Sequence, residues 1–204
     1  MKQTYGILVL AAGQSSRFGS DKLLAKMSDG KHVITHALAP LQKIASKHRL
    51  PLMVITRPDN HRLIDFFETH HIDYIACIDA HLGMGNSIAD GVKSNQDWHG
   101  WIIALADMPN LTVEILDTLL IEINNNPNEI VRLNFNDKGK NTPSHPVYFP
   151  PKYGFQLSQL TGDNGARKLI KKQRLINISQ NFYLMDVDTQ AALVEIKLGN
   201  KPTI

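Results

Sequence analysis

Short apolar runs alternate with longer amphipathic segments through the first 124 residues of the chain. The run at 6–11 is apolar throughout, which is typical of a strand buried on both faces of a parallel sheet. Apolar residues then recur at helical spacing over 33–47, so that they fall on one stripe of a helix. The same patterns predict further strands at 51–56, 72–78 and 101–105, and further helices at 60–70, 87–94 and 113–124, the last capped by Thr112.

This regular alternation of strand and helix ends after residue 124. The patterns there predict strands at 130–135 and 145–149 around a hairpin tip at 137–141, then a helix at 163–172, a strand at 183–187 and a helix at 190–198. Regular alternation of strand and helix implies βαβ units, a parallel sheet and right-handed crossovers. A length of 204 residues without a linker or repeat favours a single domain over 1–204. The predicted fold is α/β with three layers, α/β/α, and a mostly parallel sheet with a short antiparallel C-terminal part.

The composition is that of a folded protein, with 43% hydrophobic and 20% charged residues. The net charge of +3 comes from scattered Lys and Arg, so the chain lacks the basic stripe of a nucleic-acid binder and suits a small anionic ligand. The single cysteine, Cys77, excludes an intrachain disulfide and a multi-cysteine zinc site, and its apolar neighbours predict a buried thiol. No signal peptide and no apolar stretch of about 20 residues is present, so we expect a cytoplasmic protein with no membrane partner.

The first predicted strand runs directly into a polar loop that extends from Ala12 to Lys22. Small residues and Gly13 at the carboxyl end of a strand let a ligand approach the backbone, and ligands bind at this edge of open α/β sheets. Ser15, Arg17 and Lys22 add donors and two cations that suit a triphosphate. The spacing matches neither the P-loop nor the dinucleotide fingerprint. On composition alone, an ordinary polar turn is an equally good interpretation.

Five blocks of sequence carry a family resemblance. They are L-A-A-G-Q-S-S-R-F-G with the following D-K-L-L at 10–24, G-M-G-N-S-I-A-D-G at 83–91, A-L-A-D-M-P at 104–109, S-H-P-V-Y-F at 144–149 with L-T-G-D-N-G-A-R at 160–167, and D-V-D-T at 186–189. In this order they resemble the nucleotidyltransferase superfamily that includes the molybdenum cofactor cytidylyl- and guanylyltransferases. The fourth block resembles the cytidylyltransferase branch. The resemblance covers nearly the whole chain and implies a Rossmann-like nucleotidyltransferase fold.

The resemblance also implies a reaction, in which a terminal phosphate of an acceptor attacks the α-phosphorus of a nucleoside triphosphate and pyrophosphate leaves. Arg17 and Lys22 are then expected to hold the triphosphate. Asp107 is expected to bind Mg²⁺, with Asp188 as a second ligand and Asp186 behind it. The alternatives are a turn or capping role for Asp107 and an N-cap role for Asp188.

The nucleotide is expected to lie against the first strand and the glycine-containing turn. The residues predicted to bind it are Leu10, Ala11, Ala12, Gly13, Ser15, Gly85, Asn86 and Ser87. In this superfamily L-A-A-G goes with cytidine preference and L-A-G-G with guanosine preference, so Ala12 indicates CTP. A single methyl group in a pocket is worth only about 1–3 kcal/mol of discrimination.

His145 and Arg167 are expected on the acceptor side of the site. The alternative for His145 is packing beside Pro146. The helix predicted to open at Asp163 offers an anion site at its N-terminus, to which Arg167 adds charge, whereas a plain N-cap role for Asp163 is equally compatible with the sequence.

Three departures from the family pattern concern the C-terminal half. Ser144 stands where the cytidylyltransferases usually have glycine, and Gln190 begins the segment that replaces the expected P-E-D. The segment 137–142 lacks the arginine expected near an acceptor phosphate, so Lys138 or Lys140 is expected to substitute. These departures bear on the acceptor more than on nucleotidyl transfer.

The leading hypothesis is a magnesium-dependent CTP:molybdopterin cytidylyltransferase, with CTP and a phosphorylated pterin as substrates and a molybdoenzyme or chaperone as candidate recipient of the product. The enzymatic alternatives are a guanylyltransferase of the same cofactor pathway and a cytidylyltransferase acting on a sugar or polyol phosphate. A non-catalytic alternative is a nucleotide-binding chaperone for a molybdoenzyme, which the intact Arg17, Lys22 and Asp107 disfavour. An NAD-dependent Rossmann enzyme is excluded, because the first loop lacks the required glycine spacing.

Overall fold

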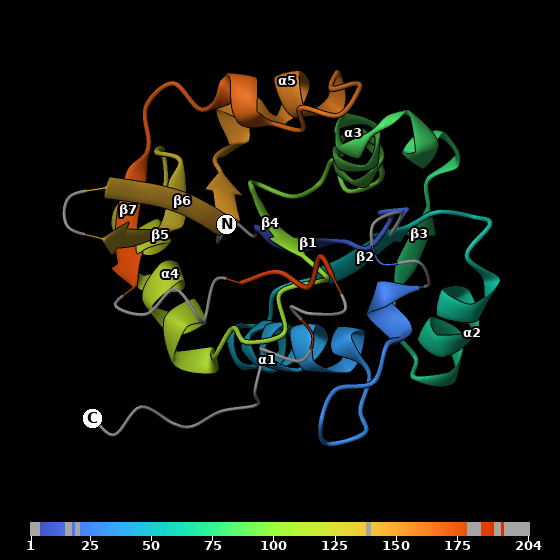
Figure 1. Ribbon diagram of the computed structural model, residues 1–204. Coiled ribbons are helices and arrows are strands. Elements are labelled where there is room, and N and C mark those ends of the chain that lie inside the picture. The colour runs from blue at the N-terminus through green and yellow to red at the C-terminus, as the bar shows by residue number, and fades with distance from the viewer. Residues whose placement is uncertain are drawn as a thin grey trace.

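The structure is a computed structural model that describes residues 5–14, 18, 21–137, 140–178, 185–189 and 193. Within these residues seven strands form one sheet in the order β3-β2-β1-β4-β6-β5-β7 (Figure 1). The strands are β1 (Gly6–Leu10), β2 (Leu52–Thr56), β3 (Tyr74–Ala76), β4 (Trp101–Leu105), β5 (Val131–Asp137), β6 (Lys140–Phe149) and β7 (Arg174–Ile178). The helices are α1 (Val33–His48), α2 (His61–Thr69), α3 (Met84–Ser94), α4 (Val113–Asn125) and α5 (Gly154–Ser158). Four short 3-10 helices are η1 (Lys22–Leu24), η2 (Ile78–Leu82), η3 (Pro151–Tyr153) and η4 (Arg167–Leu169).

The sheet is mostly parallel, as the sequence predicts. β1 pairs in parallel with both β2 and β4, and β2 pairs in parallel with β3. β6 is antiparallel to both of its neighbours, β4 and β5, whereas the edge strand β7 is again parallel to β5. The antiparallel part therefore consists of one strand, β6, which enters the sheet through the predicted hairpin.

The helices form two layers that cover opposite faces of the sheet. In Figure 1, α1, α2 and α4 lie below the sheet and α3 and α5 above it. Alternation along β1 divides the core between the two faces: Ile7 and Val9 pack with α1, α2 and α4, while Leu8 and Leu10 pack with α3 and α5. Because both faces are covered by apolar side chains, β1 is hydrophobic at every position, which confirms the three-layer prediction.

Hydrogen bonds at two helix starts confirm the predicted cap at Thr112 and add a cap at Asn60. The Thr112 hydroxyl accepts a hydrogen bond from the Ile115 amide at 3.4 Å and caps α4. The Asn60 side chain accepts one from the Leu63 amide at 3.3 Å and caps α2.

Cys77 is fully buried, as its apolar neighbours predict. Burial, together with the nearby Asp90 carboxylate, raises the pKa of its thiol to about 12. The thiol is therefore protonated and unreactive.

The prediction of a helix at 163–172 is wrong. Turns occupy this segment, and only η4 is helical. Gly162, just before the segment, and Gly165, within it, have φ values of 72° and 49°, and the left-handed backbone at Gly165 interrupts a right-handed helix. The sequence analysis also missed β7, which follows this segment and extends the sheet beyond β5, and it missed α5.

The last two predicted elements fall largely outside the described residues. Residues 183 and 184 of the predicted strand are not described, and residues 185–189 form no strand and pair with none of the described strands. Of the predicted terminal helix at 190–198 the structure describes only residue 193. No helix within the described part of the chain is long and apolar enough to cross a bilayer.

The two isoleucines of α4 give a matched test of this layering. Ile123 is 0% exposed in the core, whereas Ile121 is 61% exposed on the same helix. We expect Ile123→Ala to lower the free energy of unfolding by about 2–5 kcal/mol, because it leaves a cavity in the core. Ile121→Ala should change it by no more than about 0.5 kcal/mol. Urea denaturation monitored by circular dichroism measures both values, and equal losses would contradict the placement of α4.

Candidate nucleotide and metal site

The site begins where β1 and β4 end at the same edge of the sheet. The two strands are paired in parallel with Leu10 opposite Leu105, and the Ala106 amide donates to the Leu10 carbonyl at 3.1 Å. On the other side of β1, the Ala11 amide donates to the Ile55 carbonyl at 2.7 Å. These bonds hold the first residues of the loop after β1 beside the segment that carries Asp107.

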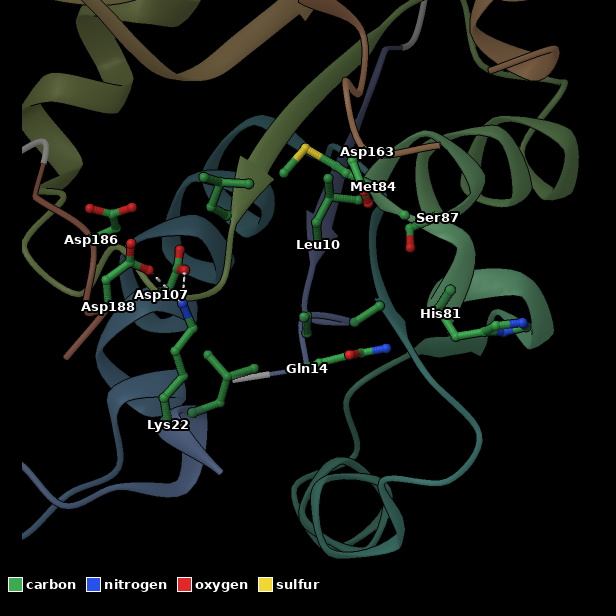
Figure 2. A pocket seen from close by; sticks show the side chains of 17 residues that line it. Leu10, Gln14, Lys22, His81, Met84, Ser87, Asp107, Asp163, Asp186 and Asp188 are labelled. Atoms are coloured by element: carbon green, nitrogen blue, oxygen red, sulfur yellow. Dashed lines mark hydrogen bonds and ion pairs between the residues drawn. The ribbon is translucent and has the colours of Figure 1, made fainter. Parts of the chain in front are cut away.

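A cavity of about 550 Å³ opens at this edge. Figure 2 shows Lys22 and three aspartates on one side of it, His81, Ser87, Met84 and Asp163 on the other, and Leu10 and Gln14 between them. The residues that line it are Leu10, Ala11, Ala12, Gly13, Gln14, Lys22, Leu23, Ala80, His81, Gly83, Met84, Ser87, Leu105, Asp107, Asp163, Asp186 and Asp188.

Three carboxylates meet on one wall of this cavity. Asp107, Asp186 and Asp188 each offer an oxygen within 4.8 Å of the other two. Asp107 follows β4, and the segment 185–189 is held beside it because the Val187 amide donates to the Asp107 carbonyl at 2.9 Å. The fully buried Val187 anchors this segment, so that the residues before and after it project their carboxylates toward Asp107.

The side chain of Lys22 points at this group of carboxylates. Its ammonium group donates hydrogen bonds to Asp107 Oδ2 and, at 3.2 Å, to Asp188 Oδ1 (Figure 2). Burial lowers the pKa of Lys22, but the charges of Asp107 and Asp188 and the hydrogen bonds to them outweigh burial and raise it. Lys22 therefore carries its positive charge at neutral pH.

The carboxylates carry more negative charge than Lys22 alone balances. Partial loss of water contact and the charges of Asp107 and Asp188 raise the pKa of Asp186. Asp107 Oδ1 is buried and has no hydrogen-bond partner among the residues that the structure describes. Oxygen donors of this kind fit a hard divalent cation such as Mg²⁺, which would satisfy the orphaned oxygen and relieve the repulsion.

The position of Lys22 depends on a short chain of hydrogen bonds to α2. Asp21 Oδ1 accepts from the Leu23 amide at 3.1 Å and caps η1. Asp21 Oδ2 accepts from the Asn60 side-chain amide at 2.7 Å, and Asn60 in turn caps α2. Asn60 therefore links the start of α2 to the 3-10 helix that carries Lys22.

The start of α3 forms the other wall together with the loop at 161–163. The Gly85 amide donates to the Gly162 carbonyl at 2.8 Å, and the Gly162 amide donates to Asn86 Oδ1 at 2.9 Å. A Cβ atom on Gly85 would come within 2.7 Å of the Thr161 carbonyl oxygen, so only glycine allows this approach. Gly85 and Asn86 thus hold the loop and do not line the cavity, which Gly83, Met84 and Ser87 line instead.

The structure brings most of the predicted site residues into this one cavity. Those that line it are Leu10, Ala11, Ala12, Gly13, Lys22, Ser87, Asp107, Asp186 and Asp188. Ser15 and Arg17 lie outside the described residues. The sequence analysis did not select Gln14, His81, Met84 and Asp163, although all four stand within or next to the quoted family blocks.

His145 and Arg167 line a second cavity, also of about 550 Å³, which shares Met84 and Asp163 with the first. It lies over β4, β5 and β6, beneath the segment 163–173. Burial, followed by the charge of Arg132, lowers the pKa of His145 to about 4, so the imidazole is neutral at neutral pH.

Arg132 also lines this cavity and was missed, because it lies within a predicted strand and outside every quoted block. Lys138, one of the expected substitutes for an acceptor arginine, lies outside the described residues, and Lys140 does not line either cavity.

Comparison with known proteins gives the family. Residues 7–177 match the model of the MobA-like NTP transferase domain, which covers most of the chain. The chain belongs to the MobA-like NTP transferase family. This confirms the resemblance that the five sequence blocks carry, and it makes the protein an enzyme of the nucleotidyltransferase class.

Relatives of this MobA-like protein extend over almost its whole length. The purine catabolism protein PucB of Bacillus subtilis (strain 168) is 29% identical over 205 residues, which cover 93% of this chain and 94% of PucB. Rv0371c of Mycobacterium tuberculosis H37Rv, solved in complex with manganese, has a TM-score of 0.73 at 19% identity and covers 95% of this chain and 99% of its own. The 4-diphosphocytidyl-2C-methyl-D-erythritol synthase of Anaerococcus prevotii DSM 20548 has a TM-score of 0.72 at 14% identity, over 94% of this chain and 93% of its own. The two solved structures show a shared fold.

The two helix caps offer a test of how Lys22 is positioned. Asn60→Ala and Thr112→Ala each remove an N-cap, which costs about 1 kcal/mol of stability. Only Asn60→Ala also releases Asp21 and η1, so we expect only this variant to weaken binding of a nucleoside triphosphate, about threefold to tenfold, the equivalent of one hydrogen bond. Urea denaturation and titration calorimetry measure the two effects. If both variants bound the nucleotide with wild-type affinity, the link from α2 to Lys22 would have no role in the site.

Proposed function

We propose that the protein is a magnesium-dependent CTP:molybdopterin cytidylyltransferase that transfers CMP to a phosphorylated pterin and releases pyrophosphate. The observation that carries the proposal is the single cavity in which the loop Ala11, Ala12 and Gly13 faces Lys22 and the carboxylate cluster. A small-residue loop accommodates a nucleotide, and the charged wall opposite suits its phosphates. The product would pass to a molybdoenzyme or its chaperone.

The carboxylates and Lys22 divide the phosphate chemistry between them. Asp107, Asp186 and Asp188 would hold Mg²⁺, which when bound neutralises charge on the phosphate oxygens. A lysine ammonium has three N–H donors, and Lys22 gives two of them to Asp107 and Asp188, so among the described residues the third is left for the triphosphate. Arg17, by its place in the loop, would add a second cation for the departing pyrophosphate. No covalent nucleophile is required, since in-line attack needs alignment and charge neutralisation.

The nucleotide base is assigned to the part of the cavity between β1 and η2. Ala12 contributes its methyl group there, and the walls include Ala80, His81 and Ser87. Ala12 would favour binding of CTP over GTP, since its methyl group narrows the space for a purine. The second cavity, which adjoins the first at Met84 and Asp163, is the proposed place of the acceptor.

A polyol phosphate is the second candidate acceptor. It is favoured by the structural similarity to the Anaerococcus prevotii protein, whose name describes a diphosphocytidyl-methylerythritol synthase. The alternative on the nucleotide side is a guanylyltransferase, which would bind GTP in the same cavity.

The metal assignment predicts a large effect of one substitution. Asp107→Asn removes a charge from the cluster and from the ion pair with Lys22. We expect the rate of pyrophosphate release from CTP and molybdopterin to fall about 100-fold or more, because a metal ion contributes several kcal/mol to such a reaction. Asp117→Asn breaks another Lys–Asp ion pair, with Lys47 on the surface, and serves as the control with unchanged rate. A wild-type rate and wild-type Mg²⁺ dependence for Asp107→Asn would refute the metal site.

The nucleotide assignment predicts a difference that depends on Ala12. In the presence of Mg²⁺ we expect CTP to bind more tightly than GTP, and Ala12→Gly to reduce this preference by about tenfold, the range expected for one methyl group. Equilibrium binding of the two nucleotides to both proteins measures this directly. Tighter binding of GTP by the wild-type protein would overturn the assignment of CTP.

A further inference from the structure

The second cavity carries two arginines that nucleotide binding does not use. Arg132 stands on β5 and Arg167 begins η4, and both side chains line this cavity. Neither guanidinium forms an ion pair with a carboxylate in the described part of the chain. Asp163 is the only acidic residue in the lining, and it lies at the border with the first cavity.

Most of the donors of these arginines lack an acceptor among the residues that the structure describes. Arg132 Nε donates to the Ser144 carbonyl at 3.1 Å, and its Nη1 donates to Gln173 Oε1 at 3.5 Å. A guanidinium has five N–H groups, so these two bonds leave three without a partner among the described residues. The Ser144 bond also fixes the plane of the guanidinium. The exposed side chain of Arg167 donates no hydrogen bond within the described residues.

The arrangement of charge in this cavity calls for an anion. Burial, and then the positive charge of Arg167, lowers the pKa of Arg132, so the two cations are close enough to repel each other. His145 is neutral and adds a polar group without charge. An anion that contacts both guanidinium groups would remove the repulsion and accept the unused donors.

The same cavity has an apolar floor. Ile103, Val147 and Phe149, from β4 and β6, are each no more than 2% exposed and line it beneath the arginines. A ligand here must therefore present an apolar or flat surface to the sheet and an anionic group to the arginines.

The two cavities divide the charged residues between them. Lys22 and Asp107 line only the first cavity, and Arg132 and Arg167 line only the second. Attack on the α-phosphorus takes place where the triphosphate is held, in the first cavity. We propose that Arg132 and Arg167 form an anion subsite that holds the acceptor through an anionic group other than its attacking phosphate. The subsite thus selects acceptors that carry charge at both ends and a flat or apolar body between them; its acceptor role rests on the proposed nucleotidyl transfer.

The anion subsite is tested first without turnover. Inorganic phosphate is titrated into the ¹⁵N-labelled protein at constant ionic strength, and the side-chain Nε–Hε resonances of arginine are followed by NMR. We expect the Arg132 and Arg167 signals to shift along one saturable curve, while the signal of the exposed Arg62 on α2 does not. Arg167→Gln should weaken the response at Arg132 about tenfold, the value of a charged hydrogen bond, and Arg62→Gln should not. Shifts at both arginines no larger than at Arg62 would overturn the subsite.

The role in acceptor binding is tested by steady-state kinetics with CTP and molybdopterin, whose dithiolate is anionic and separate from its phosphate. Arg132→Gln and Arg167→Gln should each raise KM for molybdopterin about tenfold and leave KM for CTP within about twofold of wild type. Arg132→Lys keeps the charge but not the planar fork, so its KM for molybdopterin should fall between those of the wild type and Arg132→Gln. An unchanged KM for molybdopterin in both glutamine variants refutes the acceptor role. Absence of turnover by the wild-type protein counts against the proposed function instead, and the phosphate titration then decides on the subsite by itself.

Discussion

The parallel pairing of β1 with β4 is the constraint on which the site depends. It places Leu10 opposite Leu105, so the loop after β1 and the segment with Asp107 leave the sheet side by side. The loop brings Lys22 back to this edge, where its ammonium group meets Asp107 and Asp188. A shift in the register of these two strands would separate a cation from its carboxylates and leave buried charges without partners.

Charge is distributed unevenly between the two cavities. The first cavity combines three aspartates with one lysine, which suits a divalent cation and a triphosphate together. The second cavity combines two arginines with a neutral histidine over an apolar floor, which suits an anion attached to an apolar body. Under the proposed function, this difference would give each of the two substrates its own electrostatic environment.

The start of α3 and the loop at 161–163 form the boundary between these environments. Gly83 has φ of 122° and Gly85 lies against the Thr161 carbonyl, so two glycines allow the loop to pack directly on the helix. Met84 and Asp163, one from each side of this contact, line both cavities. A movement of the loop would therefore change both cavities at once.

The sequence by itself determined the alternation of strands and helices, the cap at Thr112, and the nucleotidyltransferase resemblance. These follow from local periodicity, local hydrogen bonding and contiguous motifs. It also indicated Asp107 and Asp188, because each stands in a recognisable block. Local pattern failed at 163–172, where Gly165 takes a left-handed backbone that a right-handed helix does not allow.

Only the tertiary structure decided which side chains share a cavity. Asn86 was predicted to contact the nucleotide but is used to hold Gly162, 76 positions further along the chain. Arg132 and Arg167 come from different parts of the chain and meet because β5 lies beneath the segment that follows residue 163. Long-range packing of this kind leaves no periodic signal in a single sequence, since it depends on the order of strands in the sheet. The sequence therefore indicated a ligand loop at the end of the first strand, and the fold decided that residues 11–14 share a cavity with Lys22 and the three aspartates.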